Sequence, residues 1–330
     1  MSESIVSNGE AEIVGNTTTG EFVLDVSVVI TTRNRAGLLE PTLTTLAAQL
    51  TRDIKWELIV VDNGSTDNTP AVVASAEGHL PIRTFRFEAA GKCRAQNFAL
   101  EQVRGALVVF TDDDVSCDPG WLSALVHAAR RWPDADLFGG AIRVRLIGEV
   151  PNWLADEAGH EIVKRHCAHY KPREDEGYTE IAPIGPNMAV RRAALRGVGF
   201  DENVGPDGTT DYIKGGDTDL NNLLMARGHR CVFVPNAIVN HHAYAHQLSI
   251  ESLFEGAFRR GRKNAYLQFL KANVPVIQLL AERQSVWRRW FKYRRARRSG
   301  ELAVYEAGMR YHYKRGYLYQ AIRQRKSGFA

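Results

Sequence analysis

Short apolar runs alternate with helical-period segments along the first third of the chain. The runs 26–30, 57–61 and 82–87 are rich in β-branched residues and are typical of strands. Between and after them, apolar residues recur three and four positions apart. This spacing predicts helices over 71–76 and 92–103 and, earlier, one that carries Leu38, Leu39, Leu43, Leu46 and Leu50. The alternation predicts an α/β fold with a doubly wound, mostly parallel sheet flanked by helices.

A fourth strand ends in three consecutive carboxylates. The segment Ala106–Ser116, ALVVFTDDDVS, is an apolar, β-branched run that leads into Asp112, Asp113 and Asp114. Like charges this close raise one another's pKa and destabilise a fold unless a metal or basic groups compensate them. Oxygen ligands favour Mg²⁺ or Mn²⁺. Taken alone, the motif is equally compatible with a solvated acidic turn.

Polar loops follow two of the other strands. Residues 31–35 (TTRNR) come after the first strand, and residues 62–65 (DNGS) come after the second. Because ligands bind beyond the carboxyl ends of parallel strands, these loops and the three aspartates are predicted to meet in one crevice. The first strand is not followed by G-x-G-x-x-G, and G-x-x-x-x-G-K-[ST] occurs nowhere in the sequence. Neither a dinucleotide site nor a P-loop is therefore supported.

The middle of the chain is predicted from weaker patterns. An amphipathic helix is expected over 119–132. Residues 151–177 carry Trp153 and three histidines that lack the i, i+4 spacing of a helical metal site, so we expect an irregular loop or lid there. A tight Gly-Pro turn within 184–192 is expected to expose Asn187 and to begin a helix.

Two further segments carry candidate functional groups. A pair of glycines opens a predicted helix, so Asp217 lies in or just before the first helical turn, where free N–H groups favour a carboxylate. From spacing alone this is compatible with an ordinary N-cap role, which Asp219 could fill equally well. After a short strand, His241 and His242 offer an imidazole that could complete a carboxylate-bound metal site, with a structural histidine as the alternative.

Composition narrows the class of protein. The chain has 330 residues, of which 44% are hydrophobic and 24% charged, as in ordinary soluble globular proteins. Its four cysteines lack C-x-x-C spacing, so we expect neither a zinc site nor a disulfide framework, and a cytoplasmic location. Residues 1–24 are predicted to be a disordered lead-in rather than a signal peptide. No apolar run reaches the roughly 20 residues that a membrane-spanning helix needs.

The net charge of +4 is unevenly distributed. Residues 283–298 interleave aromatic side chains with a dense group of arginines, as interfacial helices do. This segment predicts an anionic membrane surface as a partner. Nucleic acid is a competing partner for such a segment, and simple packing of the helix on the domain is the third interpretation.

Five motifs resemble, in their order along the chain, those of family 2 glycosyltransferases: VVITTRNR, VVDNGSTDNT, FTDDDVSCDPGWL, GPNMAVRR and GGDTDL. The resemblance covers most of the chain. It implies a GT-A fold over 25–248, with a nucleotide-binding half (25–118) and an acceptor half (119–248), followed by a helical region over 249–330. It also implies a nucleotide-sugar donor, a divalent metal and inversion at the anomeric carbon.

The same resemblance implies a donor and metal site at the strand ends. The residues that would bind the nucleotide and the donor are Thr31, Arg33, Asp62, Asp112 and Asp113. Those that would hold Mn²⁺ or Mg²⁺ are Asp112, Asp114 and His241. The spacing to Leu248 favours His241 over His242, and Asp113 is expected to face the ribose or a basic side chain.

The resemblance places the catalytic base at Asp217, the central aspartate of a motif similar to E-D-x-D-L. Gly216 stands where the family carries a Glu, so the acceptor contact of that Glu has no counterpart side chain. Gln96 stands in the place of a family arginine, and Lys92 or Arg94 is expected to bring a positive charge to the donor instead. Acceptor contacts are expected from Asn187, Gly216 and Trp153.

Together these implications predict a metal-dependent, inverting hexosyltransferase of cell-surface polysaccharide or glycolipid assembly. A UDP-sugar is the favoured donor, and the acceptor is a saccharide or a lipid-linked molecule. We expect a cytoplasmic protein, peripheral on the membrane face through 283–298, and no nucleic acid partner. One alternative is a catalytically silent nucleotide-sugar-binding or membrane-docked scaffold, which the missing Glu would suit. Another is a phosphatase of the haloacid dehalogenase type, whose nucleophile motif the D-x-D-x-S at Asp112 loosely resembles.

Overall fold

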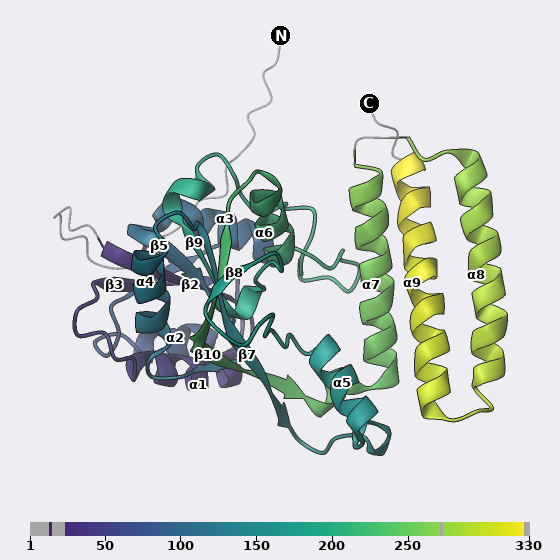
Figure 1. The fold of residues 1–330 in the computed structure, drawn as a ribbon, viewed down its shortest axis with the longest axis horizontal. Coiled ribbons are helices and arrows are strands. Elements are labelled where there is room, and N and C mark those ends of the chain that lie inside the picture. Colours follow the sequence, from purple (N-terminus) through teal and green to yellow (C-terminus); the bar gives the residue numbers. More distant parts are fainter. Residues whose placement is uncertain (1–12, 15–23, 271–272, 327–330) are drawn as a thin grey trace, which may run out of the picture. The chain divides into compact units, whose positions relative to one another are not determined.

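The computed structural model describes residues 13–14, 24–270 and 273–326 (Figure 1). The chain forms two compact units. The sheet unit consists of the described residues up to Arg145 together with Ala168–Glu202 and Gly216–His242. The helical unit consists of Leu146–Cys167, Asn203–Gly215 and the described residues from Ala243 onward. Three segments that precede the predicted boundary at residue 249 thus belong to the helical unit, namely 146–167, 203–215 and 243–248.

Most of the predicted disordered lead-in, 1–24, lies outside the described residues. Within it, Ile13–Val14 forms β1, which pairs antiparallel with β4 (Ile82–Arg86), and Leu24 begins β2 (Leu24–Thr32). For these three residues the prediction of disorder is wrong, because pairing with neighbouring strands holds them in the sheet.

Four parallel strands form the first half of the sheet, in the order β4, β3, β2, β5. The alternation of strands and helices predicted from the apolar pattern is confirmed (Figure 1). The parallel register places Thr32 beside Asp62, so the carboxyl ends of β2 and β3 lie at the same edge. The elements besides β2 and β4 are α1 (Ala36–Ala47), β3 (Trp56–Asp62), α2 (Thr69–Ser75), α3 (Lys92–Gln102) and β5 (Gly105–Phe110).

The second half of the sheet is built differently. Beyond β5 the order continues as β9, β7, β10, β6, and β8 pairs with β10 off this path. β9 is antiparallel to β5 and β7, and β10 is antiparallel to β6 and β8. The parallel arrangement is therefore a property of the first half. The elements are β6 (Val115–Cys117), β7 (Leu137–Ile147), β8 (Gly177–Thr179), β9 (Met188–Arg191) and β10 (Cys231–Tyr244).

The main core of the sheet unit lies where α1, α2 and α4 (Trp121–Arg131) pack on the parallel strands. Alternate strand residues such as Val28, Ile30 and Val60 are fully buried in it. Leu50, predicted to belong to the first helix, is 67% exposed because α1 ends at Ala47. On the buried side of the predicted amphipathic helix, now α4, lie Trp121, Leu122, Leu125 and Val126.

Residues 151–177 are not irregular as predicted. They contain the short helix η1 (Asn152–Leu154) and α5 (Glu157–His166). The side chain of Asp156 caps α5 by accepting a hydrogen bond from the N–H of Gly159 at 2.8 Å.

Residues 184–192 do not begin a helix after their Gly-Pro turn. The turn, η2 (Gly185–Asn187), leads into β9, whose Met188, Ala189 and Val190 are fully buried between β5 and β7. A four-residue strand buried on both faces lacks the alternation by which a strand is identified in a sequence. A further short helix, η3 (Arg192–Leu195), follows it.

Three long helices dominate the helical unit: α7 (Ile250–Gln268), α8 (Val276–Ala296) and α9 (Glu301–Lys326). They follow a short helix, η4 (Ala245–Leu248), and α9 packs against both α7 and α8 (Figure 1). Gly261 and Gly316 permit the close approach of α7 and α9. A Cβ at either glycine would lie 1.9 Å from a carbonyl oxygen of the facing helix. In the part of the chain that the structure describes, no helix is long and apolar enough to cross a membrane.

Candidate active site

The loops after β2 and β3 are tied together by hydrogen bonds. Asn34 has a φ of +52°, which Asn tolerates better than most residues, and its Oδ1 accepts the N–H of Thr66 at 2.7 Å. Asp62 accepts the N–H of Ser65 at 2.8 Å on Oδ1 and the Arg86 guanidinium at 3.2 Å on Oδ2. The two polar loops predicted to meet in one crevice are therefore adjacent.

The middle aspartate of the triplet is compensated by a basic side chain. Asp113 is buried, accepts the Thr32 hydroxyl hydrogen bond at 2.7 Å, and lies 3.1 Å from Nε of Arg35. Arg35 also contacts Asp114, through Nη2 at 2.5 Å. Burial raises the pKa of Asp113 to about 6, a rise that Arg35 opposes and Asp114 reinforces. Asp113 is thus directed away from the cluster that its two neighbours form.

Asp112 and Asp114 form a cluster with His241. One ligand atom from each side chain lies within 4.8 Å of the others, and Nε2 of His241 is 3.6 Å from Oδ1 of Asp114. Among the described residues, neither Oδ1 of Asp114 nor Nδ1 of His241 has a hydrogen-bond partner, although both atoms are buried. Buried polar atoms are rarely left without a partner. Two carboxylates, an imidazole and an unpartnered oxygen fit a divalent cation such as Mn²⁺ or Mg²⁺.

Strand pairing selects His241 over its neighbour. In the antiparallel ladder of β10 and β6, His241 stands opposite Val115, one residue after the aspartates. His242 lies instead with its Nε2 at 2.8 Å from the Ser116 hydroxyl. Burial, together with Arg145, lowers the pKa of His242. Only His241 belongs to the carboxylate cluster.

Lys92 joins this cluster to Asp217. Asp217 is the first residue of α6 (Asp217–Ala226) and accepts a hydrogen bond from Gln96 at 2.8 Å. The ammonium of Lys92, in the first turn of α3, lies 2.7 Å from Asp112 and 3.5 Å from Asp217. Burial alone would lower the pKa of Lys92, but Asp112 and Asp217 outweigh it and raise that pKa above its usual value. The site therefore contains a charged lysine between two carboxylates.

Two glycines allow α6 to start this close to its neighbours. Gly216 has a φ of +124°, and a Cβ there would lie 2.8 Å from the sulfur of Cys93. A Cβ on Gly185 would lie 2.2 Å from Oδ2 of Asp217. The Glu expected at position 216 from the resemblance would thus require both a different backbone conformation and a shift of α3.

The predicted donor residues have different surroundings. Asp62 is buried, Thr31 is half-buried and Arg33 is exposed at the same strand ends. Arg94 is exposed and pairs with Glu202 at 3.7 Å rather than with the aspartates. Of the two basic side chains weighed for the donor, the structure brings Lys92 into the site.

The prediction of an exposed Asn187 is wrong. The side chain is fully buried, and its amide donates hydrogen bonds to the carbonyls of Ala141 at 3.0 Å and Ala237 at 2.8 Å. Its Oδ1 accepts the indole N–H of Trp121 at 2.8 Å. Asn187 therefore joins β7, β10 and α4 and has no polar atom left for an acceptor. A polar residue after a Gly-Pro turn is usually exposed, and only the long-range pairing of β7 and β10 buries this one.

Trp153, the third residue expected to contact the acceptor, lies in the helical unit. Its ring packs against Tyr305 of α9 at 5.4 Å, and His166 of α5 lies 2.8 Å from the Tyr305 hydroxyl. Gly216, another of the three predicted acceptor residues, directly precedes Asp217 at the start of α6.

Arg35 and the partnership of Gln96 with Asp217 could not be inferred from the pattern. Arg35 lies in a polar loop that also contains Arg33, and no sequence pattern distinguishes the two arginines. The resemblance indicates only that Gln96 occupies the position of a family arginine, not that it contacts Asp217. The hydrogen bond to Asp217 spans 121 residues of the chain, a contact that local spacing does not encode.

Comparison with known proteins identifies the family. Residues 27–199 match the family model of glycosyl transferase family 2, and the chain belongs to this family. It is 39% identical over 171 residues to a validoxylamine A glucosyltransferase of Streptomyces hygroscopicus subsp. jinggangensis, covering 51% of this chain but only 35% of that relative. It is 33% identical over 223 residues to glycosyltransferase AglE of Haloferax volcanii, covering 66% of this chain and 67% of AglE.

A solved structure shares the fold. The mannosyltransferase PcManGT from Pyrobaculum calidifontis, in complex with GDP-Man and Mn²⁺, superposes with a TM-score of 0.55 at 21% identity, covering 92% of this chain and 88% of that one. The predicted GT-A type architecture, a sheet flanked by helices with C-terminal helices added, is confirmed.

Proposed function

We propose that this protein is a metal-dependent, inverting glycosyltransferase that moves a sugar from a nucleoside-diphosphate donor to a hydroxyl acceptor. The observation that carries the proposal is the group of Asp112, Asp114 and His241, joined through Lys92 to a separate carboxylate, Asp217. One cluster suits a cation and a diphosphate, and the other carboxylate suits a base. Family membership supports the reaction class.

Asp112, Asp114 and His241 would hold Mn²⁺ or Mg²⁺, which would supply positive charge where the nucleoside diphosphate departs. Lys92 lies within reach of the same region and would add a second positive charge to the diphosphate. Arg35 holds Asp113 and Asp114 in place from the other side.

Asp217 would accept the proton of the acceptor hydroxyl as the oxygen attacks the anomeric carbon of the donor. The hydrogen bond from Gln96 to Oδ1 orients the carboxylate. With one base and no side chain in the role of a nucleophile, the sugar is displaced directly. The bond to the diphosphate breaks on the opposite face of the ring, and the anomeric configuration inverts.

The donor nucleotide would lie on the edge formed by Thr31, Arg33 and Asp62, and we propose UDP as its nucleotide. The neighbour PcManGT binds GDP-Man with Mn²⁺, so GDP is the main competitor. The acceptor would be a saccharide or a lipid-linked molecule of cell-surface polysaccharide or glycolipid assembly. The protein would act in the cytoplasm, at an anionic membrane surface through its basic segment 283–298, and without a nucleic acid partner.

Thermal unfolding with UDP, GDP and dTDP, each with and without Mn²⁺, tests the site. We expect UDP to raise the unfolding temperature most and only with Mn²⁺, because a ligand that binds the folded state stabilises it by mass action. Asp114→Asn should abolish the shift. Asp53→Asn, the same change on an exposed loop residue, should preserve it. A shift of equal size without metal would contradict metal dependence. Nucleotide binding without any donor turnover would favour the catalytically silent alternative.

A further inference from the structure

Helix α8 exposes a continuous apolar face. This face is formed by Val276 (52% exposed), Ile277 (79%), Leu280 (59%), Trp287 (60%) and Phe291 (47%). From Ile277 to Phe291 they are spaced by three, seven and four positions, which places them on one side of the helix. No residue of α8 is buried. We call these five residues the outer stripe.

The opposite side of α8 packs on α9. Tyr293 stacks on Tyr311 of α9 at 5.6 Å with the rings 10° from parallel, and Glu282 pairs with Lys314 at 2.8 Å. The aromatic residues of the basic segment are therefore divided. Tyr293 packs within the helical unit, whereas Trp287 and Phe291 of the outer stripe face away from it.

Positive charge borders the outer stripe. Residues 276–298 contain eight arginines or lysines and one acidic residue, Glu282. At 3.6 residues per turn, Arg283 and Arg294 lie along one edge of the stripe and Arg288 and Arg295 along the other. All four are exposed. Among the described residues, the only ion pair made from α8 is that of Glu282 with Lys314. Both basic edges thus remain available to an external anion.

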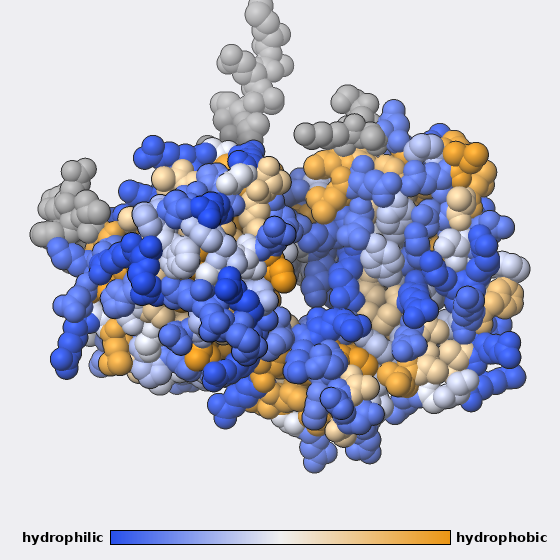
Figure 2. Space-filling model, viewed as in Figure 1, coloured by the Kyte–Doolittle hydropathy of each residue, from blue (hydrophilic) through white to orange (hydrophobic). Residues whose placement is uncertain are grey.

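The apolar surface continues where α8 begins. The last turns of α7 and α9 meet the start of α8 there, around Val274, Tyr317 and Ala321. Leu267 in the last turn of α7 is 45% exposed, and Leu270, two residues beyond the helix, is 37% exposed. Figure 2 shows hydrophobic residues gathering at this end of the helical unit.

We propose that α8 docks on an anionic lipid bilayer, lying in the headgroup plane with its outer stripe against the acyl chains. Arginine edges would contact lipid phosphates while Trp287 and Phe291 enter the interface, as in amphipathic interfacial helices. A second copy of the chain is a poorer occupant, because it would bring the same positive edges together. The benefit to catalysis rests on the proposed function, since docking would bring the protein to a lipid-linked acceptor.

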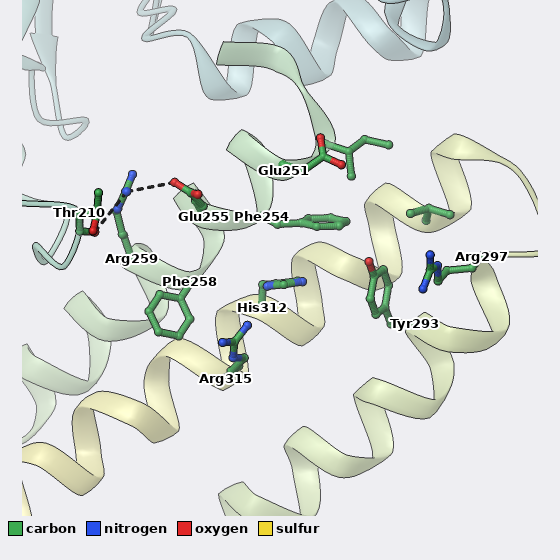
Figure 3. Close-up of a pocket in the computed structure, with 12 residues that line it drawn as sticks. Thr210, Glu251, Phe254, Glu255, Phe258, Arg259, Tyr293, Arg297, His312 and Arg315 are labelled. Carbon is green, nitrogen blue, oxygen red and sulfur yellow. Dashed lines mark hydrogen bonds and ion pairs between the residues drawn. The ribbon is translucent and has the colours of Figure 1, made fainter. Parts of the chain in front are cut away.

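The groove between α7, α8 and α9 does not compete with the stripe as the docking surface. It has a volume of about 680 Å³, and Phe254, Tyr293 and His312 lie in it (Figure 3). Phe254 and His312 stack on each other at 4.6 Å, and Arg259 is paired with Glu255. Its aromatic and charged groups thus largely contact one another, unlike those of the outer stripe.

Co-sedimentation of the full chain with lipid vesicles tests the docking. We expect binding to vesicles of equal parts phosphatidylcholine and phosphatidylglycerol, weaker binding with added salt, and little binding to phosphatidylcholine alone. Combined Leu280→Gln, Trp287→Gln and Phe291→Gln should weaken binding by at least about tenfold. Combined Arg288→Gln and Arg295→Gln should weaken it by roughly tenfold.

A matched control separates the stripe from exposed apolar residues in general. Leu50, Ile181 and Leu223 of the sheet unit are 67%, 56% and 42% exposed, and their combined change to Gln should leave vesicle binding intact. Circular dichroism should show the same helix content in every variant, since the replaced side chains are exposed. Asp217→Asn protein should bind vesicles as the wild type does, so a failure of docking and a failure of transfer are measured separately.

Three results would overturn the proposal. The first is the absence of binding by the wild type at low salt, and the second is equal binding by the stripe variant. The third is self-association, measured by sedimentation velocity, that is lost in the stripe variant although vesicle binding is not. That result would make the outer stripe an interface between copies of the chain. Binding of double-stranded DNA in preference to vesicles, unaffected by the stripe variant, would instead indicate a nucleic acid surface.

Discussion

The sheet unit and the helical unit arrange charge in opposite ways. In the sheet unit, buried or half-buried carboxylates meet basic side chains of the same chain, as Asp113 meets Arg35 and Asp112 meets Lys92. In the helical unit, α8 gathers basic residues of one sign on an exposed face. Buried charges require partners within the fold, whereas a concentration of exposed like charge is stabilised only from outside. We assign the first arrangement to the proposed reaction site and the second to the proposed lipid-docking surface.

The strongest test of the proposed reaction site in the sheet unit is to remove the carboxylate that we assign to proton transfer. Asp217→Asn should lower glycosyl transfer by about 10²- to 10⁴-fold while the donor still binds, because only the base is lost. The matched control is Asp219→Asn in the same helical turn, where the carboxylate accepts the Gly216 N–H at 3.0 Å. That variant should lose stability rather than turnover. Transfer rates and nucleotide-induced thermal shifts of both proteins decide the point, and robust turnover by Asp217→Asn would falsify the assignment.

Lys92 tests whether the half-buried basic side chains of the sheet unit act on the donor. Lys92→Met should reduce transfer on the order of 10²-fold, because it removes a positive charge beside the proposed position of the departing diphosphate. Arg94→Met, two residues further along α3 and paired with Glu202, should have little effect. The measurement is kcat/KM for the donor with saturating Mn²⁺. Equal losses in the two variants would mean that general positive charge, not the position of Lys92, matters.

Local pattern was sufficient to predict the parallel half of the sheet and its acidic end. β2, β3 and β5 are buried runs rich in β-branched residues. The change from apolar to polar residues therefore predicts where these strands end, and Asp62 and Asp112 lie at those ends. Buried strands followed by polar loops are detectable because both features are contiguous in the sequence.

Other parts of the site depend on contacts between distant residues. His241 reaches Asp114 only because β10 pairs with β6, more than a hundred residues earlier in the chain. Asn187 is buried by β7 and β10 together, and β9 is too short and too uniformly buried to show a period. Motif order could suggest His241, but spacing could not show that Asn187 is buried or that Arg35 pairs with Asp113.

The helical unit is sensitive where its backbones touch. Gly316→Ala on α9 should cost about 1–3 kcal/mol of unfolding free energy, because the new Cβ would meet the Phe258 carbonyl oxygen at 1.9 Å. Gly256→Ala on α7 has open space around it and should stabilise by about 0.5–1 kcal/mol through helix propensity. Urea unfolding followed by circular dichroism compares the two. If both glycines behave alike, close packing of α7 and α9 does not limit stability.

A pH-dependent effect is expected from a histidine that the helical unit keeps neutral. Burial, reinforced by Arg315, lowers the pKa of His312 from 6.5 to about 4. In that window the unfolded chain binds a proton that the folded chain does not, so stability should fall as the pH drops from 6.5 toward 4. His312→Phe keeps a ring against Phe254 and should flatten part of this slope. His166, whose pKa is lowered to about 4 as well, should maintain the rest of the pH dependence.

Unfolding midpoints at pH 6.5 and pH 4 measure this loss of stability. His79→Gln, at an exposed position, is a control that should follow the wild type. Parallel profiles for wild type and His312→Phe would show that this side chain does not penalise protonation in the fold.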